Sequence, residues 1–199
     1  MDATVCIGTY GDEKWIETAQ RAIASVEALD LPYQHVHDLT LARSRNIALG
    51  RCRTEFVIFL DADDELSPDY IEAMETGTAD LRCPAVSWRD RGSRMCAPFV
   101  PQVYKHKHAC TGDCLPEGNF IVIGALVKTR IAKDVGGFKE FEWSEDWDLW
   151  VRCWQAGATI ETIPQAIYIA HFDPNSRNRQ GTQAWRDKVH MEIHAANFP

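Results

Sequence analysis

The feature that most constrains the fold is an apolar run that ends at a group of aspartates. Residues 56–60, Phe-Val-Ile-Phe-Leu, are rich in β-branched and aromatic side chains. This composition is typical of a strand that is buried on both faces of a parallel sheet. Asp61, Asp63 and Asp64 follow at once. Because open α/β sheets bind ligands at the C-terminal ends of their strands, the aspartates are predicted to lie at a ligand site.

The aspartates also predict a divalent cation. Carboxylate oxygens suit Mg²⁺ or Mn²⁺, and these ions usually keep open positions for substrate phosphates. Asp61 and Asp63 share one side of an extended continuation of the strand, so both can face one ion or one ligand. A polar turn that leads into a helix at Ser67-Pro68 explains the same residues without a ligand. The residues alone leave both interpretations open.

Length and composition narrow the functional classes. The 199 residues suffice for one well-buried core, and 45% hydrophobic with 25% charged residues is ordinary for a soluble enzyme or binding protein. The net charge of −8 argues against general nucleic-acid or anionic-membrane binding, since both need clustered positive charge. No apolar run is long enough to span a bilayer, the first residues show no signal-peptide pattern, and seven scattered cysteines indicate reduced thiols. We therefore expect a cytoplasmic protein.

Strand and helix patterns alternate along the first part of the chain. Strands are expected over residues 4–7 and 33–38, and helices over residues 15–29 and 42–51. Together with the strand at 56–60, this order predicts an α/β fold with a mostly parallel central sheet, right-handed crossovers and helices on its faces.

The remainder of the chain is expected to add further strands and helices around the same sheet. The expected segments are a helix capped by Ser67 and running to 74, a hairpin of residues 81–88 and 95–103, a surface loop at 104–118, a strand at 120–127, a short helix ending at Gly136-Gly137, a helix at 145–156 capped by Ser144, extended segments at 158–163 and 166–170, and an amphipathic helix from Gly181 with Trp185, Val189 and Ile193 on one side.

Aromatic and acidic residues alternate where one of these helices begins. Residues 143–150 are Trp-Ser-Glu-Asp-Trp-Asp-Leu-Trp. The helix dipole stabilises acids in a first turn, which alone explains Glu145 and Asp146. Aromatic faces also stack on sugars, and a carboxylate on a rigid helix start can take a proton from a hydroxyl. Trp143 and Trp147 are therefore candidates for acceptor binding and Asp146 for catalysis, with the purely structural interpretation equally open.

Taken together, five segments resemble the GT-A-fold glycosyltransferases of family 2, in the order of that family's motifs. Residues 5–11 are similar to the first strand of the family and its Thr-Tyr-Asn turn, with Gly11 in place of Asn. Residues 44–47 are similar to its Ala-Arg-Asn motif, and residues 56–64 to its Leu-Asp-x-Asp-Asp motif. Residues 135–138 with 145–150 are similar to its Gly-Gly-Phe and Glu-Asp motifs, and residues 168–171 to the Tyr-Arg-x-His end of its catalytic domain.

The resemblance implies an inverting, metal-dependent transfer of a sugar from a nucleotide sugar to an acceptor hydroxyl. The donor that it implies first is a UDP-sugar. It implies Asp146 as the general base and Glu145 as a residue that orients the acceptor or supports the base. Asp63 is implied as a ligand of Mn²⁺ or Mg²⁺, Asp61 as a contact of the ribose or the metal, and His171 as a further metal ligand. An ordinary half-buried histidine is the alternative for His171.

The resemblance also implies a domain layout and a donor-binding set. Residues 1–172 would form the GT-A domain, and residues 173–199 a tail whose amphipathic helix packs on it. The family places a further helix and strand before its Ala-Arg-Asn motif, so the N-terminal half of this chain is shortened by about one βα unit. Tyr10 would stack on the nucleobase. The implied donor-binding residues are Thr9, Tyr10, Gly11, Glu13, Asp38, Arg45, Asn46, Asp61 and Ala62.

Residues 89–114 carry two further candidate sites. His106, His108, Cys110 and Cys114 could form a tetrahedral zinc site, although their spacing matches no familiar zinc finger. A solvated loop is the alternative. Several basic side chains make the same region a candidate acceptor-binding surface: Arg89, Arg91, Arg94, Lys105 and Lys107.

Two other functions compete with glycosyl transfer. The shortened N-terminal half is compatible with a catalytically inactive nucleotide-sugar or carbohydrate-binding module, and the aspartates alone with a metal-dependent phosphohydrolase. The first leaves the predicted base unexplained, and the second leaves the tryptophan-rich helix start unexplained. The acceptor could be a carbohydrate, a lipid-linked sugar, a protein or a small molecule.

Overall fold

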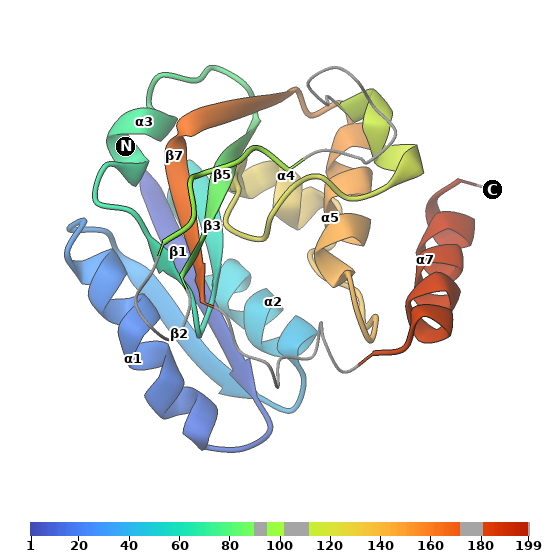
Figure 1. The fold of residues 1–199 in the computed structure, drawn as a ribbon, viewed down its shortest axis with the longest axis horizontal. Coiled ribbons are helices and arrows are strands. Elements are labelled where there is room, and N and C mark those ends of the chain that lie inside the picture. Colours follow the sequence, from blue (N-terminus) through green and yellow to red (C-terminus); the bar gives the residue numbers. More distant parts are fainter. Residues whose placement is uncertain (90–94, 102–111, 172–180, 199) are drawn as a thin grey trace.

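The computed structural model of the protein describes residues 1–89, 95–101, 112–171 and 181–198. Within these residues, one seven-stranded sheet is flanked by helices, and its strand order is β2-β1-β3-β6-β5-β7-β4 (Figure 1). Five of the seven described strands run in one direction, and β4 and β6 run against them. The predicted α/β fold with a mostly parallel sheet is confirmed.

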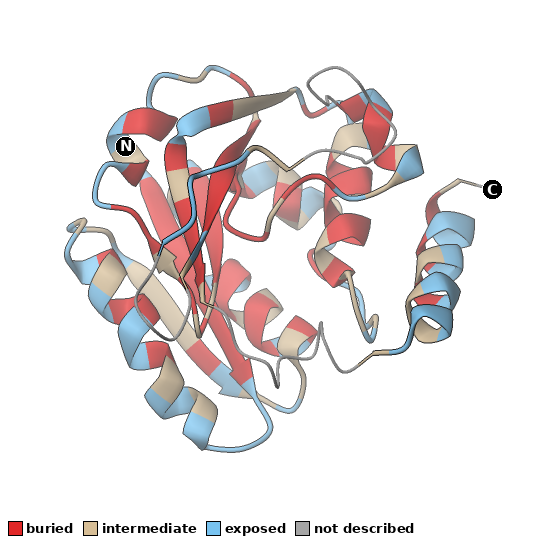
Figure 2. Cartoon of the chain, in the orientation of Figure 1, coloured by how far each residue is buried: buried red, intermediate tan, exposed pale blue. Residues whose placement is uncertain are grey.

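The N-terminal half alternates strands and helices as its patterns predict. Its elements are β1 (Ala3–Tyr10), α1 (Lys14–Glu27), β2 (Tyr33–Asp38), α2 (Leu41–Arg51) and β3 (Phe56–Asp61). Strand β1 pairs in parallel with both β2 and β3. The five apolar residues of β3 are all buried, because helices cover both faces of the sheet at this point. Figure 2 shows this concentration of buried residues on the central strands.

The second half completes the sheet and adds the helices that reach the site. Strand β5 is parallel to β7, and β6 joins β5 to β3. The elements are β4 (Glu65–Leu66), α3 (Tyr70–Met74), β5 (Leu81–Arg89), the 3₁₀ helix η1 (Gly112–Glu117), β6 (Leu126–Lys128), α4 (Thr129–Asp134), α5 (Glu145–Gln155), β7 (Ile160–His171) and α7 (Gln183–Asn197).

Two strand predictions are wrong in their bounds. The strand expected at 120–127 begins only at Leu126, and Phe120, Ile121 and Ile123 lie buried in irregular backbone before it. The apolar run therefore reflects burial rather than strand pairing. The two extended segments after α5 form one strand, β7, whose pairing with β5 shifts register between Pro84 and Ala85.

Both predicted helix caps also differ from the structure. Helix α3 begins at Tyr70, and Ser67 instead offers its backbone carbonyl to the Tyr70 N–H at 3.0 Å. Ser144 does precede α5, but its side chain makes no capping hydrogen bond and its φ is 54°. Of the expected hairpin, the described residues show antiparallel bridges between Val86 and Phe99 and between Arg89 and Met95; its turn lies outside the described residues.

Helix α7 packs on α5 and keeps its outer face exposed (Figures 1 and 2). Val189 and Ile193 of the predicted stripe are buried, and Trp185 is partly buried. Thr182 caps the helix by accepting a hydrogen bond from the Trp185 N–H at 3.2 Å. Among the described residues, no helix combines the length and the apolar character that crossing a bilayer requires.

Candidate active site

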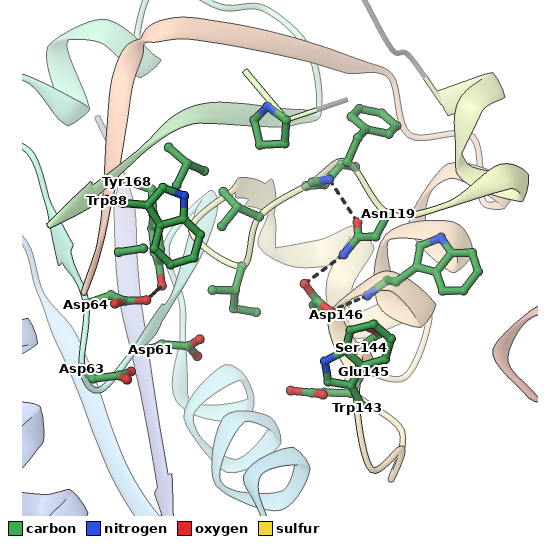
Figure 3. Close-up of a pocket in the computed structure, with 18 of the residues that line it drawn as sticks. Asp61, Asp63, Asp64, Trp88, Asn119, Trp143, Ser144, Glu145, Asp146 and Tyr168 are labelled. Atoms are coloured by element: carbon green, nitrogen blue, oxygen red, sulfur yellow. Dashed lines mark hydrogen bonds between the residues drawn. The ribbon is translucent and has the colours of Figure 1, made fainter. Parts of the chain in front are cut away.

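Three aspartates lie together where β3 ends. Ligand oxygens of Asp61, Asp63 and Asp64, the aspartate cluster, lie within 4.8 Å of one another (Figure 3). Asp64 is buried, and both of its oxygens have donors: the Tyr168 hydroxyl at 2.5 Å and the His171 backbone N–H at 2.7 Å. Burial, followed by the charges of Asp63 and Asp61, raises the pKa of Asp64. Strand β7 therefore anchors this end of the aspartate cluster.

The chemistry of the aspartate cluster fits a divalent cation. Its three carboxylates supply hard oxygen ligands, and Asp61 and Asp63 are only partly buried, so a phosphate could reach the same ion. The cluster is at the same time a turn, since the Asp64 N–H donates to the Asp61 carbonyl at 3.1 Å. The ring of His171 contacts Glu65, with Nε2 2.5 Å from Oε1. Among the described residues, His171 is not part of the group of converging ligand atoms.

Arg45, on α2, joins the aspartate cluster to the start of α5. Its side chain is 2% exposed, and its guanidinium donates to Asp61 Oδ1 at 2.5 Å and to Glu145 Oε1 at 2.7 Å. Burial alone would lower the pKa of Arg45, but the charges of Asp61 and Glu145 outweigh burial and raise it. Its guanidinium carbon also lies 4.9 Å from the centre of the Phe138 ring. Arg45 therefore stays charged and holds two acids in fixed positions.

The Gly-Gly-Phe turn is tied to α2 next to Arg45. The Asn46 amide donates to the Phe138 carbonyl at 2.8 Å, and its oxygen accepts from the Phe138 N–H at 2.8 Å. Gly137 has a φ of 67°, and a Cβ at this residue would lie 2.3 Å from Asn46 Oδ1. Glycine is required at this close approach. Both ends of the Asn46 amide are used, so Asn46 positions the Gly-Gly-Phe turn.

Asp146 lies at the start of α5, across the pocket from the aspartate cluster (Figure 3). It is partly buried; Asn119 Nδ2 donates to its Oδ2 at 3.1 Å, and the Trp147 N–H donates to its Oδ1 at 2.9 Å. Burial, followed by the charge of Glu145, raises the pKa of Asp146 to about 7, although Arg45 opposes the shift. A carboxylate with a pKa near neutrality is suited to accept a proton from a hydroxyl.

One pocket of about 780 Å³ contains both acidic groups. Strands β3, β5 and β7, the segment before β6, and helices α2, α5 and α7 all contribute to its lining. The structure therefore assembles side chains that are distant in the sequence. The predicted site residues that line the pocket are Arg45, Asp61, Asp63, Trp143, Glu145, Asp146, Trp147 and His171.

The remaining predicted donor-binding residues lie outside this lining. The Thr9 hydroxyl is buried between two imidazoles, 3.0 Å from His35 Nε2 and 3.1 Å from His37 Nδ1. Tyr10 is 37% exposed at the end of β1, the same sheet edge at which β3 ends, so its ring is accessible to a ligand. The residues outside the lining are Thr9, Tyr10, Gly11, Glu13, Asp38, Asn46 and Ala62.

Asp38 has partners of its own at the end of β2. Its Oδ1 accepts from the Leu39 N–H at 2.6 Å and from Arg43 Nε at 2.9 Å. The Leu39 hydrogen bond and then the Arg43 contact lower the pKa of Asp38. Arg43 thus pairs with Asp38 on the surface. In this arrangement Asp38 orders the turn into α2.

The two tryptophans expected to bind the acceptor differ in their surroundings. Trp147 is 1% exposed, its indole N–H donates to the Leu115 carbonyl at 3.0 Å, and its ring centre lies 4.4 Å from that of His190. The Trp147 ring is therefore a packing residue between α5 and α7, and the expectation that it stacks on an acceptor is corrected. Trp143 is partly buried beside Trp185, with ring centres 5.8 Å apart, and lines the pocket.

Several pocket residues had no predicted role. Asn119 lies in a segment without periodicity, so no pattern could mark it. Trp88 is the last residue of the strand predicted at 81–88, and that pattern indicated only strand pairing. Arg186 and His190 flank the apolar stripe of α7, and only the packing of that helix reveals that they face the pocket.

The second candidate region lies largely outside the described residues. Of the possible zinc ligands, Cys114 is described and is fully buried in η1. Of the basic surface, Arg89 is described, and its guanidinium lies 3.6 Å from the Glu65 carboxylate. The other members lie outside the described ranges: Arg91, Arg94, Lys105, His106, Lys107, His108 and Cys110.

Comparison with known proteins identifies relatives of the chain. It is 30% identical over 149 residues to a pre-mycofactocin glycosyltransferase of Mycobacterium tuberculosis, covering 69% of this chain and 31% of the relative. It is 30% identical over 115 residues to an uncharacterized glycosyltransferase of Methanocaldococcus jannaschii, covering 55% of this chain and 39% of the relative. The chain thus spans about a third of the length of these relatives.

Solved structures share the fold. Residues 1–349 of S. aureus TarS in complex with UDP-GlcNAc superimpose with a TM-score of 0.67 at 16% identity, covering 99% of this chain and 66% of that one. The complex of the same protein with UDP gives a TM-score of 0.58 at 19% identity, covering 97% and 70%. The model of glycosyl transferase family group 2 matches residues 56–180, which is more than half of the chain. The chain belongs to glycosyl transferase family group 2 and has the GT-A fold.

Proposed function

We propose that the protein is an inverting, metal-dependent glycosyltransferase that moves a sugar from a UDP-sugar to an acceptor hydroxyl. The observation that supports this proposal most directly is the placement of Asp146 and the aspartate cluster on opposite sides of one pocket. The cluster suits a cation and a diphosphate, and Asp146 suits a base. Structural neighbours bound to UDP-GlcNAc and to UDP favour uridine in the donor.

The transfer would be a single displacement. The Asp146 carboxylate takes the proton of the acceptor hydroxyl, and the acceptor oxygen forms a bond to the anomeric carbon. The bond from that carbon to the diphosphate oxygen breaks on the opposite side, so the configuration inverts and the electron pair leaves with UDP. A divalent cation at the aspartate cluster would neutralise the charge of the leaving diphosphate. Arg45 keeps Asp61 and Glu145 oriented throughout.

His171 is proposed to complete the ion site. Glu145 is proposed to support Asp146, the base, and Glu145 is itself held by its hydrogen bond from Arg45. Tyr10, Gly11 and Glu13 are proposed to contact the nucleoside, since β1 ends beside β3. The acceptor is proposed to approach along Trp143.

Calorimetry with UDP, CDP, GDP and ADP tests this function. With Mn²⁺ present we expect UDP to bind with the highest affinity, and with EDTA we expect that binding to be lost or weakened at least tenfold. Binding of none of the four by the folded protein would contradict the proposal. Release of free sugar phosphate from UDP-sugars, without transfer, would assign a phosphohydrolase instead.

A further inference from the structure

One wall of the pocket is apolar and has no charged side chain among its described residues. The end of β5 contributes Val86 and Trp88, the segment paired with it contributes Phe99 and Pro101, and residues 120–123 supply its other side chains. Figure 3 shows Trp88 pointing toward the space between the aspartate cluster and Asp146. This apolar wall adjoins the predicted base. The chemistry of the wall therefore indicates which class of acceptor brings its hydroxyl to the base.

Two aromatic side chains of the apolar wall are exposed although their backbone is ordered. Trp88 and Phe99 are each 44% exposed. The Val86 N–H donates to the Phe99 carbonyl at 2.8 Å, the Phe99 N–H donates back at 2.9 Å, and the Cys96 N–H donates to the Trp88 carbonyl at 2.9 Å. Paired backbone thus holds both rings at the pocket. Exposed apolar surface that gathers at one place marks a binding site.

The polar side chain that precedes residues 120–123 of the apolar wall, Asn119, already has partners at both ends of its amide. Asn119 is the polar residue nearest to Asp146 on this side, and its amide donates to Asp146 while its oxygen accepts from the Ile121 N–H at 3.0 Å. A carbohydrate needs partners for several hydroxyls, and among the described side chains of the wall only the Trp88 indole N–H can form a hydrogen bond. The charged residues of the pocket lie instead at the aspartate cluster with Arg45, at the start of α5 and on α7.

We propose that the acceptor is a small hydroxylated molecule with an aromatic body, and this inference rests on the proposed function. Its ring packs on Trp88 and Phe99, and its hydroxyl reaches Asp146. The hydroxyl proton passes to the Asp146 carboxylate, the oxygen bonds to the anomeric carbon, and UDP leaves with the electron pair of the broken bond. Aromatic stacking supplies affinity and orientation without further hydrogen bonds.

Binding of two neutral alcohols to the protein saturated with UDP and Mn²⁺ tests the acceptor class. 2-Naphthalenemethanol presents a primary hydroxyl beside an aromatic body, and methyl glucoside presents a primary hydroxyl on a sugar. By calorimetry or ligand-observed NMR we expect the Kd of the aromatic alcohol to be at least about tenfold lower. Trp88→Ala and Phe99→Ala should each raise that Kd about tenfold. Met95→Ala, which removes an exposed side chain of the same segment outside the lining, should leave it unchanged.

The outcomes separate this inference from the function on which it rests. If UDP binds with Mn²⁺ but methyl glucoside binds as tightly as the aromatic alcohol or more tightly, the aromatic acceptor is wrong and glycosyl transfer stands. A preference for the aromatic alcohol over methyl glucoside that survives both Trp88→Ala and Phe99→Ala also overturns the inference. Tight binding of long-chain alcohols alone overturns it as well. Failure of UDP to bind overturns both.

Discussion

Asp64 and Asp146 are both carboxylates of one pocket, yet their partners give them different tasks. Asp64 is buried and receives hydrogen bonds from the Tyr168 hydroxyl and the His171 N–H, so it fixes the turn after β3. Asp146 borders the cavity and is only partly buried, beside Asn119. The degree of burial therefore distinguishes the acid that fixes the turn from the acid that a substrate can reach.

Asp146→Asn should abolish transfer and spare the donor site. The amide cannot take the acceptor proton, so we expect the rate of UDP release in the presence of acceptor to fall about 10²- to 10⁴-fold. The Kd for UDP with Mn²⁺ should stay within about twofold of the wild type, because Asp146 lies across the pocket from the aspartate cluster. A variant that keeps near-full turnover would show that another residue is the base.

The raised pKa of Asp146 also predicts two pH effects of opposite sense. Because the base must be ionised, kcat/KM should rise about tenfold per pH unit up to about pH 7 and then level off. Between pH 3.8 and about 7 the folded protein binds more protons at Asp146 than the unfolded chain, so this residue lowers stability as pH rises.

Denaturant unfolding of the wild type and of Asp146→Asn measures the second effect. The variant should gain stability relative to the wild type between pH 4 and pH 7, with no further gain above pH 7. A difference in the free energy of unfolding between the variant and the wild type that stays constant across this pH range would contradict the raised pKa of Asp146.

At the scale of elements, α5 is held in place by a buried charged network. Asp148 is fully buried and accepts from Arg152 at 2.5 and 2.9 Å, from Asn197 at 2.9 Å and from Lys139 at 3.4 Å. Arg152 also donates to the Val135 carbonyl at 2.5 Å. The network joins α5 to the turn after α4 and to the end of α7, so it orients the helix that begins next to Asp146.

Asp148→Ala should destabilise the protein strongly. It leaves the Arg152 guanidinium without its carboxylate, and removing one partner of a buried pair costs about 3–5 kcal/mol. Asp134→Ala breaks the exposed pair with Arg130, also spaced i,i+4, and should change the free energy of unfolding by less than about 0.5 kcal/mol. Chemical denaturation measures both. Equal changes in the free energy of unfolding would mean that the buried pair stabilises the protein no more than the exposed pair does.

At the scale of the whole molecule, α7 closes one side of the pocket. It brings Arg186 and His190 to the lining, sets Trp185 against Trp143, and donates from the Trp185 indole to Glu142 at 2.8 Å. We therefore propose that residues 181–198 belong to the catalytic domain, although the chain reaches them only after all strands of the described sheet.

Ile193→Asp should release α7 from the body. Ile193 is fully buried, and a carboxylate there would be desolvated without a partner, whereas Met191 is 65% exposed on the same helix. In Ile193→Asp we expect protease cleavage before α7 and a lower Tm. Met191→Asp, which adds the same charge two residues earlier, should behave as the wild type. Resistance of both variants to protease would show that α7 is not held by its apolar face.

Much of the fold follows from patterns within the chain. The β-branched run before Asp61 predicts a buried strand, and the alternation of strands and helices predicts a parallel sheet, because these patterns depend on local burial. The same reasoning misplaced the start of β6, since Phe120 and Ile121 are buried without being in a strand. Apolar composition reports burial and does not by itself distinguish a strand from buried irregular backbone.

The sequence by itself determined the strand that delivers the aspartates, the acidic start of α5 and the motif order that marks the family. Only the tertiary structure decided what each polar side chain contacts. Arg45 meets Glu145 one hundred residues along the chain, the Thr9 hydroxyl lies between two histidines of β2, and Trp147 is enclosed by α7. The reason is physical: periodicity records which side of an element is buried, whereas hydrogen bonds and pKa shifts depend on which elements pack together.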